Sequence, residues 1–249
     1  MRAQAACICI YWTPPAGWRP GSWNSIRLAR TGARRQKGEF TMKITKQHML
    51  LYAVTDRSHL GGQSLEEAVE EILSAGATLL QLREKHLGEQ EFLEQAQRLL
   101  PICRRHGVPL IINDNVRVAV QSGADGVHIG LGDMAIQKAR QMLGPEKIIG
   151  ASAHSVQEAL AAAEAGADYL GCGAVFGTQT KKDAGLLPHE TLRAICAAVS
   201  LPVVAIGGIG EQNILQLRGT GVDGVAVISA MSAGSLSDVQ WRSFVPRGI

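Results

Sequence analysis

The stretch Pro202–Ile206 (Pro-Val-Val-Ala-Ile), followed by Gly207 and Gly208, decides the fold class of this chain. Every residue before the two glycines is apolar, so a strand formed there has no polar face to turn toward water. Strands that are buried on both faces have this pattern, and they occur in parallel sheets that are covered by helices. The stretch therefore predicts an α/β protein with a parallel sheet.

The same arrangement recurs along the chain, because short β-branched runs alternate with longer amphipathic segments. We expect strands at 49–55, 78–83, 109–113, 126–130, 147–152, 169–175, 202–207 and 224–229. We expect helices at 64–75, 89–106, 115–122, 134–143, 155–165, 188–199, 211–220 and 236–245. Eight β–α units close most simply as a single (β/α)8 TIM barrel over residues 42–249, and an open doubly wound sheet is the alternative.

Composition limits the classes of function. The 249 residues are 46% hydrophobic, and no apolar stretch reaches the roughly 18–20 residues that a membrane span needs. Seven basic residues and Glu39 lie in residues 1–41, which leaves 18 basic and 21 acidic residues for the rest. A mildly acidic body argues against a nucleic-acid partner. The five cysteines form no Cys-x-x-Cys pair, which indicates reduced thiols and a cytoplasmic protein.

Residues 1–41 do not conform to the repeat. This segment is rich in arginine and contains Trp12, Trp18 and Trp23, but it has no sustained helical or strand period. Lys37–Met42 can be back-translated into a purine-rich ribosome-binding site ahead of a start codon at Met42. We therefore expect residues 1–41 to be a disordered extension, or a translated leader before the natural start.

The residues that carry chemistry are expected where strands end, because ligands bind at the carboxyl ends of barrel strands. Cations, carboxylates, amides and glycines gather at those positions. They are Arg83 and Lys85 after the second strand, Asn113 and Asp114 after the third, Asp133 after the fourth, Ser152 and His154 on the fifth, Thr178, Thr180 and Lys181 after the sixth, Gly207 and Gly208 after the seventh, and Ile228 and Ser229 on the eighth. This set predicts a site for phosphates and a metal ion.

Asp114 and Asp133 follow adjacent strands, so their side chains can reach the same point. Two carboxylates without a histidine or cysteine partner suit a hard cation such as Mg²⁺, which keeps waters and bridges substrate phosphates. The competing interpretation is that each aspartate caps the helix that follows it.

Gly207 and Gly208 resemble the phosphate site that is common after the last two strands of such barrels, where glycines and a helix N-terminus face the anion. A packing turn is the alternative. Lys85 and Lys181 are interpreted as phosphate-binding groups. Among the histidines, only His154 is expected beside the site.

Taken together, these motifs resemble the thiamine-phosphate synthase family. The family pattern appears as Gln81–Lys85, Ile112–Asp114, Gly126–Gly130 with Asp133, Gly173–Lys181 and Ile206–Ile209. The resemblance covers about residues 48–245, and the number and order of the motifs make it specific. It implies a transferase that joins a pyrimidine diphosphate to a thiazole phosphate and so makes thiamine phosphate and pyrophosphate.

The resemblance also implies roles for individual residues. Gln81, Leu82, Arg83, Glu84, Lys85, Asn113, Ser152 and Lys181 would hold the pyrimidine diphosphate, and Arg83, Lys85, Ser152 and Lys181 are the implied catalytic groups. Thr178, Gln179, Thr180, Gly208, Ile228 and Ser229 would hold the thiazole phosphate. Asp114 and Asp133 would bind Mg²⁺. The implied partners are these small molecules, with no nucleic acid or membrane, and a homo-oligomer is compatible with the sequence.

The sequence departs from the family at Leu131, where Gln is usual, and at Ala174 and Gly177, where Pro is common. Two other functions stay open, and the presence of Asp114, Asp133, Lys85 and Lys181 argues for the synthase over the first of them. One is a thiazole tautomerase, which shares the barrel and the thiazole-phosphate site but uses neither a diphosphate nor Mg²⁺. The other is a catalytically silent phosphate-binding barrel.

Overall fold

The computed structural model describes residues 43–60, 62–177 and 185–228. Within them, parallel strands pair in sequence order, and β8 pairs with β1 to close a barrel. The strands are β1 (Leu51–Val54), β2 (Leu79–Leu82), β3 (Leu110–Asn113), β4 (Gly126–Ile129), β5 (Ile148–Ala153), β6 (Tyr169–Cys172), β7 (Val203–Ile206) and β8 (Gly224–Val227). The expected (β/α)8 barrel is confirmed, and the open doubly wound sheet is wrong.

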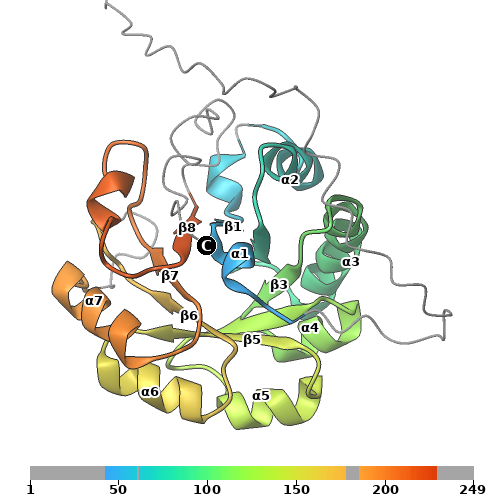
Figure 1. Ribbon diagram of the computed structural model, residues 1–249. Coiled ribbons are helices and arrows are strands. Elements are labelled where there is room, and N and C mark those ends of the chain that lie inside the picture. Colours follow the sequence, from blue (N-terminus) through green and yellow to red (C-terminus); the bar gives the residue numbers. More distant parts are fainter. Residues whose placement is uncertain (1–42, 61, 178–184, 229–249) are drawn as a thin grey trace, which may run out of the picture. The chain divides into compact units, whose positions relative to one another are not determined.

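Helices surround the barrel and connect successive strands (Figure 1). They are α2 (Leu65–Ser74), α3 (Glu89–His106), α4 (Val116–Ser122), α5 (Ile136–Leu143), α6 (Val156–Glu164) and α7 (His189–Ala198). The start of α2 follows from its sequence, because Ser64 and Glu67 form a reciprocal capping box. None of the helices in the described part of the chain is long and apolar enough to cross a membrane.

One of the expected helices differs from the structure, and another is not tested by it. The helix expected at 211–220 is only a short 3₁₀ turn, η3 (Ile214–Leu217), and the helix expected at 236–245 lies outside the described residues. A short helix that was not expected, α1 (Lys46–Met49), precedes β1, and a second 3₁₀ turn, η2 (Arg57–His59), follows it. The predicted first strand therefore began two residues too early.

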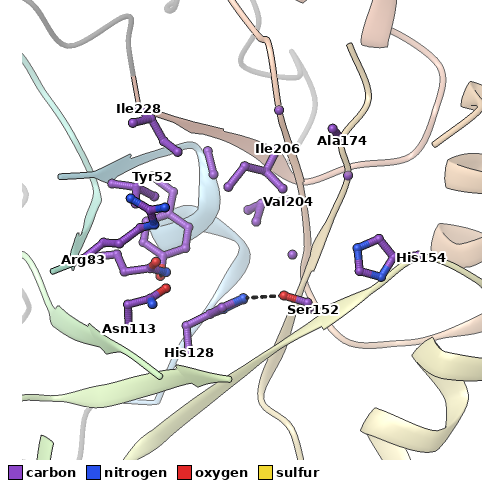
Figure 2. Close-up of a pocket in the computed structure, with 16 residues that line it drawn as sticks. Tyr52, Arg83, Asn113, His128, Ser152, His154, Ala174, Val204, Ile206 and Ile228 are labelled. Atoms are coloured by element: carbon purple, nitrogen blue, oxygen red, sulfur yellow. Dashed lines mark hydrogen bonds between the residues drawn. The ribbon is translucent and has the colours of Figure 1, made fainter. Parts of the chain in front are cut away.

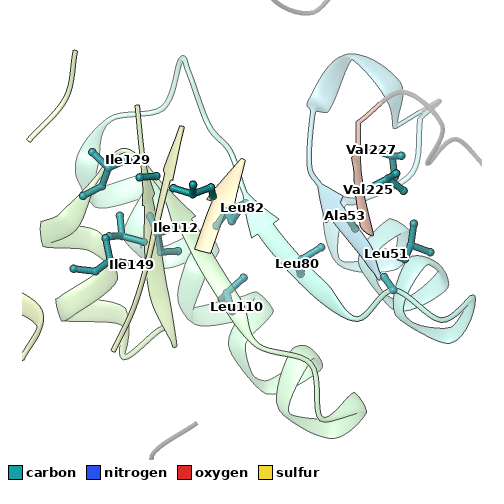
Figure 3. Close-up of a cluster of buried hydrophobic side chains, with 14 of the residues drawn as sticks. Leu51, Ala53, Leu80, Leu82, Leu110, Ile112, Ile129, Ile149, Val225 and Val227 are labelled. Carbon is teal, nitrogen blue, oxygen red and sulfur yellow. The ribbon is translucent and has the colours of Figure 1, made fainter. Parts of the chain in front are cut away.

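Alternation along the strands creates two cores. Residues such as Leu80, Leu82, Ile112 and Val227 point outward and pack against the helices (Figure 3). Strand residues of the opposite parity fill the barrel interior together with Met49 of α1; they are Tyr52, Val54, Leu79, Ile111, Ile148, Tyr169, Val204 and Ala226. The interior set contains two tyrosines, so the inside of this barrel is partly polar.

Candidate active site

The carboxyl ends of the strands surround a cavity of about 140 Å³. Its lining brings together several residues that were predicted from the sequence, namely Gln81, Arg83, Asn113, Ser152, His154, Gly207 and Ile228. Tyr52, His128 and Ala174 line the same cavity (Figure 2). Residues that are far apart in the chain meet here because the parallel strands all end at this side of the barrel.

Arg83 is held at the mouth of the barrel by the neighbouring loop after β1. Its backbone N–H donates to the Thr55 hydroxyl at 3.0 Å, and its guanidinium contacts the Asp56 carboxylate at 3.1 Å. The Arg83 side chain is only 13% exposed, so this pair is partly shielded from water. Asp56 thus fixes the position of a cation that remains on the cavity wall.

The next residues after β2 point in different directions. Leu82 is fully buried in the outer core. The Arg57 Nε–H donates to both oxygens of the Glu84 carboxylate, at 2.8 and 3.0 Å. Any contact of Leu82 or Glu84 with a substrate would therefore go through the backbone. The Lys85 side chain is exposed, and no ion pair joins it to another described residue.

Asp114 and Asp133 approach each other closely beside this cavity. Burial and the neighbouring Asp133 carboxylate raise the pKa of Asp114 from 3.8 to about 6. The Asp114 carboxylate also accepts a hydrogen bond of 2.5 Å from the Asn113 amide. Two carboxylates brought together in this way could hold a hard cation whose other ligands are water or phosphate oxygens.

Neither aspartate caps a helix, so the competing interpretation is wrong. Asn115 caps α4 by accepting from the Val118 N–H, and Asp114 lies before it with φ of +60°. Asp133 accepts instead from the Gly130 N–H at 2.7 Å, inside its own loop. No cluster of three or more histidines, cysteines or carboxylates suited to a metal exists among the described residues.

His128 is a site residue that the sequence reasoning missed, because only His154 was expected there. It lies on β4, and its Nε2 is 3.1 Å from the Ser152 Oγ (Figure 2). Its Nδ1 is 3.1 Å from the Tyr169 hydroxyl. Alternation within β4 could have placed it on the inward face, because its neighbours Val127 and Ile129 belong to the outer core, although its register with Asn113 and Gly150 is seen only in the structure. His154 also lines the cavity, and its side chain faces Glu158.

Two buried tyrosines extend the contacts of His128 into the barrel interior. The Tyr52 and Tyr169 hydroxyls are 2.7 Å apart, and the Gln81 amide donates to the Tyr52 oxygen at 2.6 Å. Burial raises the pKa of both phenols well above the ordinary value, so both stay neutral at physiological pH. The hydrogen bond to the Tyr52 hydroxyl therefore fixes the position of the Gln81 side chain.

Gly207 and Gly208 are used for close backbone approach. Both have positive φ, and an added Cβ would lie 2.5 Å from the Ala174 side chain at Gly207 and 2.3 Å from the Gly177 carbonyl oxygen at Gly208. A turn and the short η3 follow them, so the expected α-helix N-terminus is not formed by the described residues. Thr178, Gln179, Thr180, Lys181 and Ser229 lie outside the described residues.

Comparison with known proteins gives a consistent result. Residues 51–231 match the family model described as thiamine monophosphate synthase. The chain is 49% identical over 189 residues to a thiamine-phosphate synthase of Clostridium acetobutylicum, covering 76% of this chain and 90% of that protein. It is 44% identical to the thiamine-phosphate synthase of Caldanaerobacter subterraneus, covering 75% of this chain and 87% of that protein.

A solved structure agrees with the sequence matches. Thiamine phosphate pyrophosphorylase from Pyrococcus furiosus superposes with a TM-score of 0.72 at 40% identity, and the match covers 80% of this chain and 96% of that chain. A nitroalkane oxidase from Streptomyces ansochromogenes, at 17% identity with a TM-score of 0.57 over 74% of this chain and 66% of that chain, shares the fold alone.

Proposed function

The chain belongs to the thiamine monophosphate synthase family, and from that premise we propose how its own residues divide the work of the reaction. It is a transferase that condenses 4-amino-2-methyl-5-(diphosphooxymethyl)pyrimidine with thiazole phosphate, giving thiamine phosphate and pyrophosphate. The observation that carries the division of roles is the convergence of Gln81, Arg83, Asn113 and Ser152 on one cavity beside two carboxylates.

The pyrimidine diphosphate is assigned to the side of the cavity formed by β2, β3 and β5. Arg83 supplies a fixed positive charge, because Asp56 and Thr55 hold it in place. Asn113 and Ser152 offer hydrogen-bonding groups on the same wall. Lys85, next to this wall in sequence, and Lys181 are proposed as the further cations that contact the diphosphate, with Gln81, Leu82 and Glu84 completing the segment.

Asp114 and Asp133 are proposed to hold Mg²⁺. The donor set fits this ion, because two hard carboxylate oxygens are brought together and the repulsion between them is relieved by a cation. When bound, the ion would neutralise charge on the diphosphate and so favour its departure. Asp114 and Asp133 are the two protein ligands proposed for this site, so the remaining coordination positions of the ion would be taken by water and substrate oxygens.

The chemical step breaks the bond between the pyrimidine methylene carbon and the diphosphate oxygen, and the electron pair leaves with pyrophosphate. The electron-rich aminopyrimidine stabilises the resulting carbocation, and the thiazole nitrogen then donates its lone pair to the methylene carbon. Arg83 and the two lysines stabilise the developing negative charge, which is an electrostatic form of catalysis. The reaction requires no general base, because the attacking thiazole nitrogen carries no proton.

The thiazole phosphate is assigned to the opposite side, near β7 and β8. Gly208 and Ile228 lie at those strand ends, and Thr178, Gln179, Thr180 and Ser229 are proposed to join them. Gly207 and Gly208 let the backbone turn sharply there.

We also propose a cytoplasmic location, which the free thiols of Cys103 and Cys172 support.

The test is formation of thiamine phosphate from the two substrates, with Mg²⁺ or with a chelator. We expect product only with the metal, and we expect Asp133→Asn to abolish the Mg²⁺-dependent turnover. Glu94→Gln is the matched control, because it neutralises an exposed carboxylate on α3 that hydrogen-bonds only within its helix. A folded protein that makes no product, or equal activity without metal, would contradict the proposal.

A further inference from the structure

A continuous series of hydrogen bonds runs through the barrel interior to the cavity. It joins the Gln81 amide, the Tyr52 hydroxyl, the Tyr169 hydroxyl, the His128 imidazole and the Ser152 hydroxyl, and we call these five residues the interior network. The successive separations are 2.6, 2.7, 3.1 and 3.1 Å. The two tyrosines are fully buried, whereas Ser152 lies on the cavity wall.

Two glycines within strands make space for this network. An added Cβ at Gly150 on β5 would lie 2.1 Å from the Tyr169 ring, and one at Gly171 on β6 would lie 3.0 Å from the His128 ring. Both glycines pair in register with members of the network, Gly150 with Tyr169 and Gly171 with Ser152. The backbone of two adjacent strands is therefore shaped around the phenol and the imidazole.

The direction of the series follows from the Gln81 amide donor together with the count of hydrogens. The Gln81 amide N–H donates to the Tyr52 oxygen, so the single hydroxyl hydrogen of Tyr52 is directed to Tyr169. The Tyr169 hydroxyl then donates to the His128 Nδ1. A neutral imidazole that accepts at Nδ1 carries its hydrogen at Nε2, so neutral His128 donates to the Ser152 oxygen.

The opposite direction is unfavourable in this geometry. If His128 donated from Nδ1, Tyr169 would donate to Tyr52, and the Tyr52 oxygen would accept twice. Its own hydrogen would then face the Gln81 amide nitrogen in a fully buried position, where an unpaired donor is costly. Only a Gln81 side chain turned to present its Oε1 would make the reversed series possible.

We propose that Tyr52, Tyr169 and His128 are positioning residues that set His128 as the Nε2–H tautomer and so make Ser152 a hydrogen-bond donor to the pyrimidine diphosphate. The Ser152 oxygen accepts from His128, and its own hydrogen is left to point into the cavity. This role for Ser152 rests on the proposed function. The tautomer and direction of the network belong to the free protein and do not depend on it.

The first experiment measures the tautomer directly. Long-range ¹H–¹⁵N correlation spectra of ¹⁵N-histidine-labelled protein, recorded without substrates, distinguish the two neutral forms, and the signal missing in His128→Gln identifies His128. We expect the Nε2–H form. Observation of the Nδ1–H form would overturn the proposal, even if wild-type protein makes thiamine phosphate normally.

The second experiment separates the two nitrogens by substitution. His128→Gln places an amide near the Nε2 position and keeps a donor for Ser152, whereas His128→Asn keeps only a partner for Tyr169. We expect kcat/KM to stay within a fewfold of wild type in the glutamine variant. In the asparagine variant we expect a decrease on the order of tenfold, the loss of one neutral hydrogen bond in the transition state. Equal loss in both would contradict the assignment.

A double-substitution cycle tests whether His128 acts through Ser152. Ser152→Ala should remove the benefit of His128, so adding His128→Asn to it should cause no further decrease in kcat/KM. Independent, multiplying losses would show a merely structural role and overturn the proposal. Thr220→Val is the control, because it removes a buried hydroxyl that donates to the Leu217 carbonyl, outside the network. It should lower stability but leave kcat/KM unchanged.

Discussion

The carboxylate pair beside the cavity should reduce the stability of the metal-free protein, and Asp114→Asn should relieve that cost. Asparagine keeps the shape of the side chain and can still accept from the Asn113 amide. It also tolerates the left-handed conformation of this position, where φ is +60°. The substitution therefore changes the charge and adds little backbone strain.

The size of the effect follows from the pKa of Asp114. A rise from 3.8 to about 6 corresponds to about 3 kcal/mol for a fully shielded group. Neighbouring groups partly desolvate the Asp114 carboxyl group, but the residue as a whole is exposed, so solvent screening reduces the expected gain to about 1 kcal/mol. For a protein of this size, that gain raises the melting temperature by about 2–4 °C.

The gain in stability from Asp114→Asn should depend on pH. A carboxyl group with a raised pKa in the folded protein binds its proton more tightly there than in the unfolded chain, so stability falls as pH rises toward about 6. Asp114→Asn should therefore be more stable than wild type at about pH 8, and the difference should disappear at about pH 4. Thermal unfolding followed by circular dichroism with a chelator measures both.

Two further arms make the test decisive. Asp133→Asn should give a similar gain, and the double variant no more than either single variant, because the repulsion needs both charges. Mg²⁺ should raise the melting temperature of wild type but not of Asp114→Asn. A variant that is no more stable than wild type at about pH 8, or a gain that is the same at both pH values, would refute the reasoning.

Three other outcomes are expected. Gly150→Ala should destabilise the barrel by several kcal/mol or prevent soluble expression, because its Cβ would overlap the Tyr169 ring; normal urea unfolding would contradict this. Ser64→Ala should cost about 1 kcal/mol of unfolding free energy through loss of the α2 cap, and an unchanged urea midpoint would argue against it. Cys103 and Cys172, whose pKa values burial raises to about 12, should resist iodoacetamide at about pH 8 until the protein unfolds, as mass spectrometry would reveal.

Much of the fold could be predicted because each unit of the chain repeats the same local physics. The expected helix at 89–106 coincides with α3 (Glu89–His106), where a left-handed glycine, Gly107, ends the helix. The helix expected at 211–220 was wrong, although Ile214 and Leu217 do have helical spacing. Both side chains are buried, but a single 3₁₀ turn is enough to place them in the core, and no α-helix forms.

The site could be predicted only in outline. Strand ends located Arg83 and Asn113 correctly on the cavity, because a parallel barrel places all such ends together. His128 was missed, since a lone histidine within an apolar run gives no sign of its partners in the sequence. Its contact with Tyr169 depends on the register between β4, β5 and β6. The pairing of Glu84 with Arg57 likewise joins two loops that the sequence separates.

The pairing of β1 with β8, the seam that closes the barrel, has a consequence for the folding of the chain during its translation. Leu51 pairs with Val225, and Gly224 lies so close to the Met49 carbonyl that an added Cβ would be 1.9 Å from it. Lys46 and Asp223 form an ion pair across the same seam at 2.9 Å. Because these contacts join nearly the first and last described residues, β1 keeps an unpaired edge on the ribosome until β8 has emerged. An open edge of this kind can pair with other chains, so slow translation through the last repeat should favour aggregation of the nascent protein.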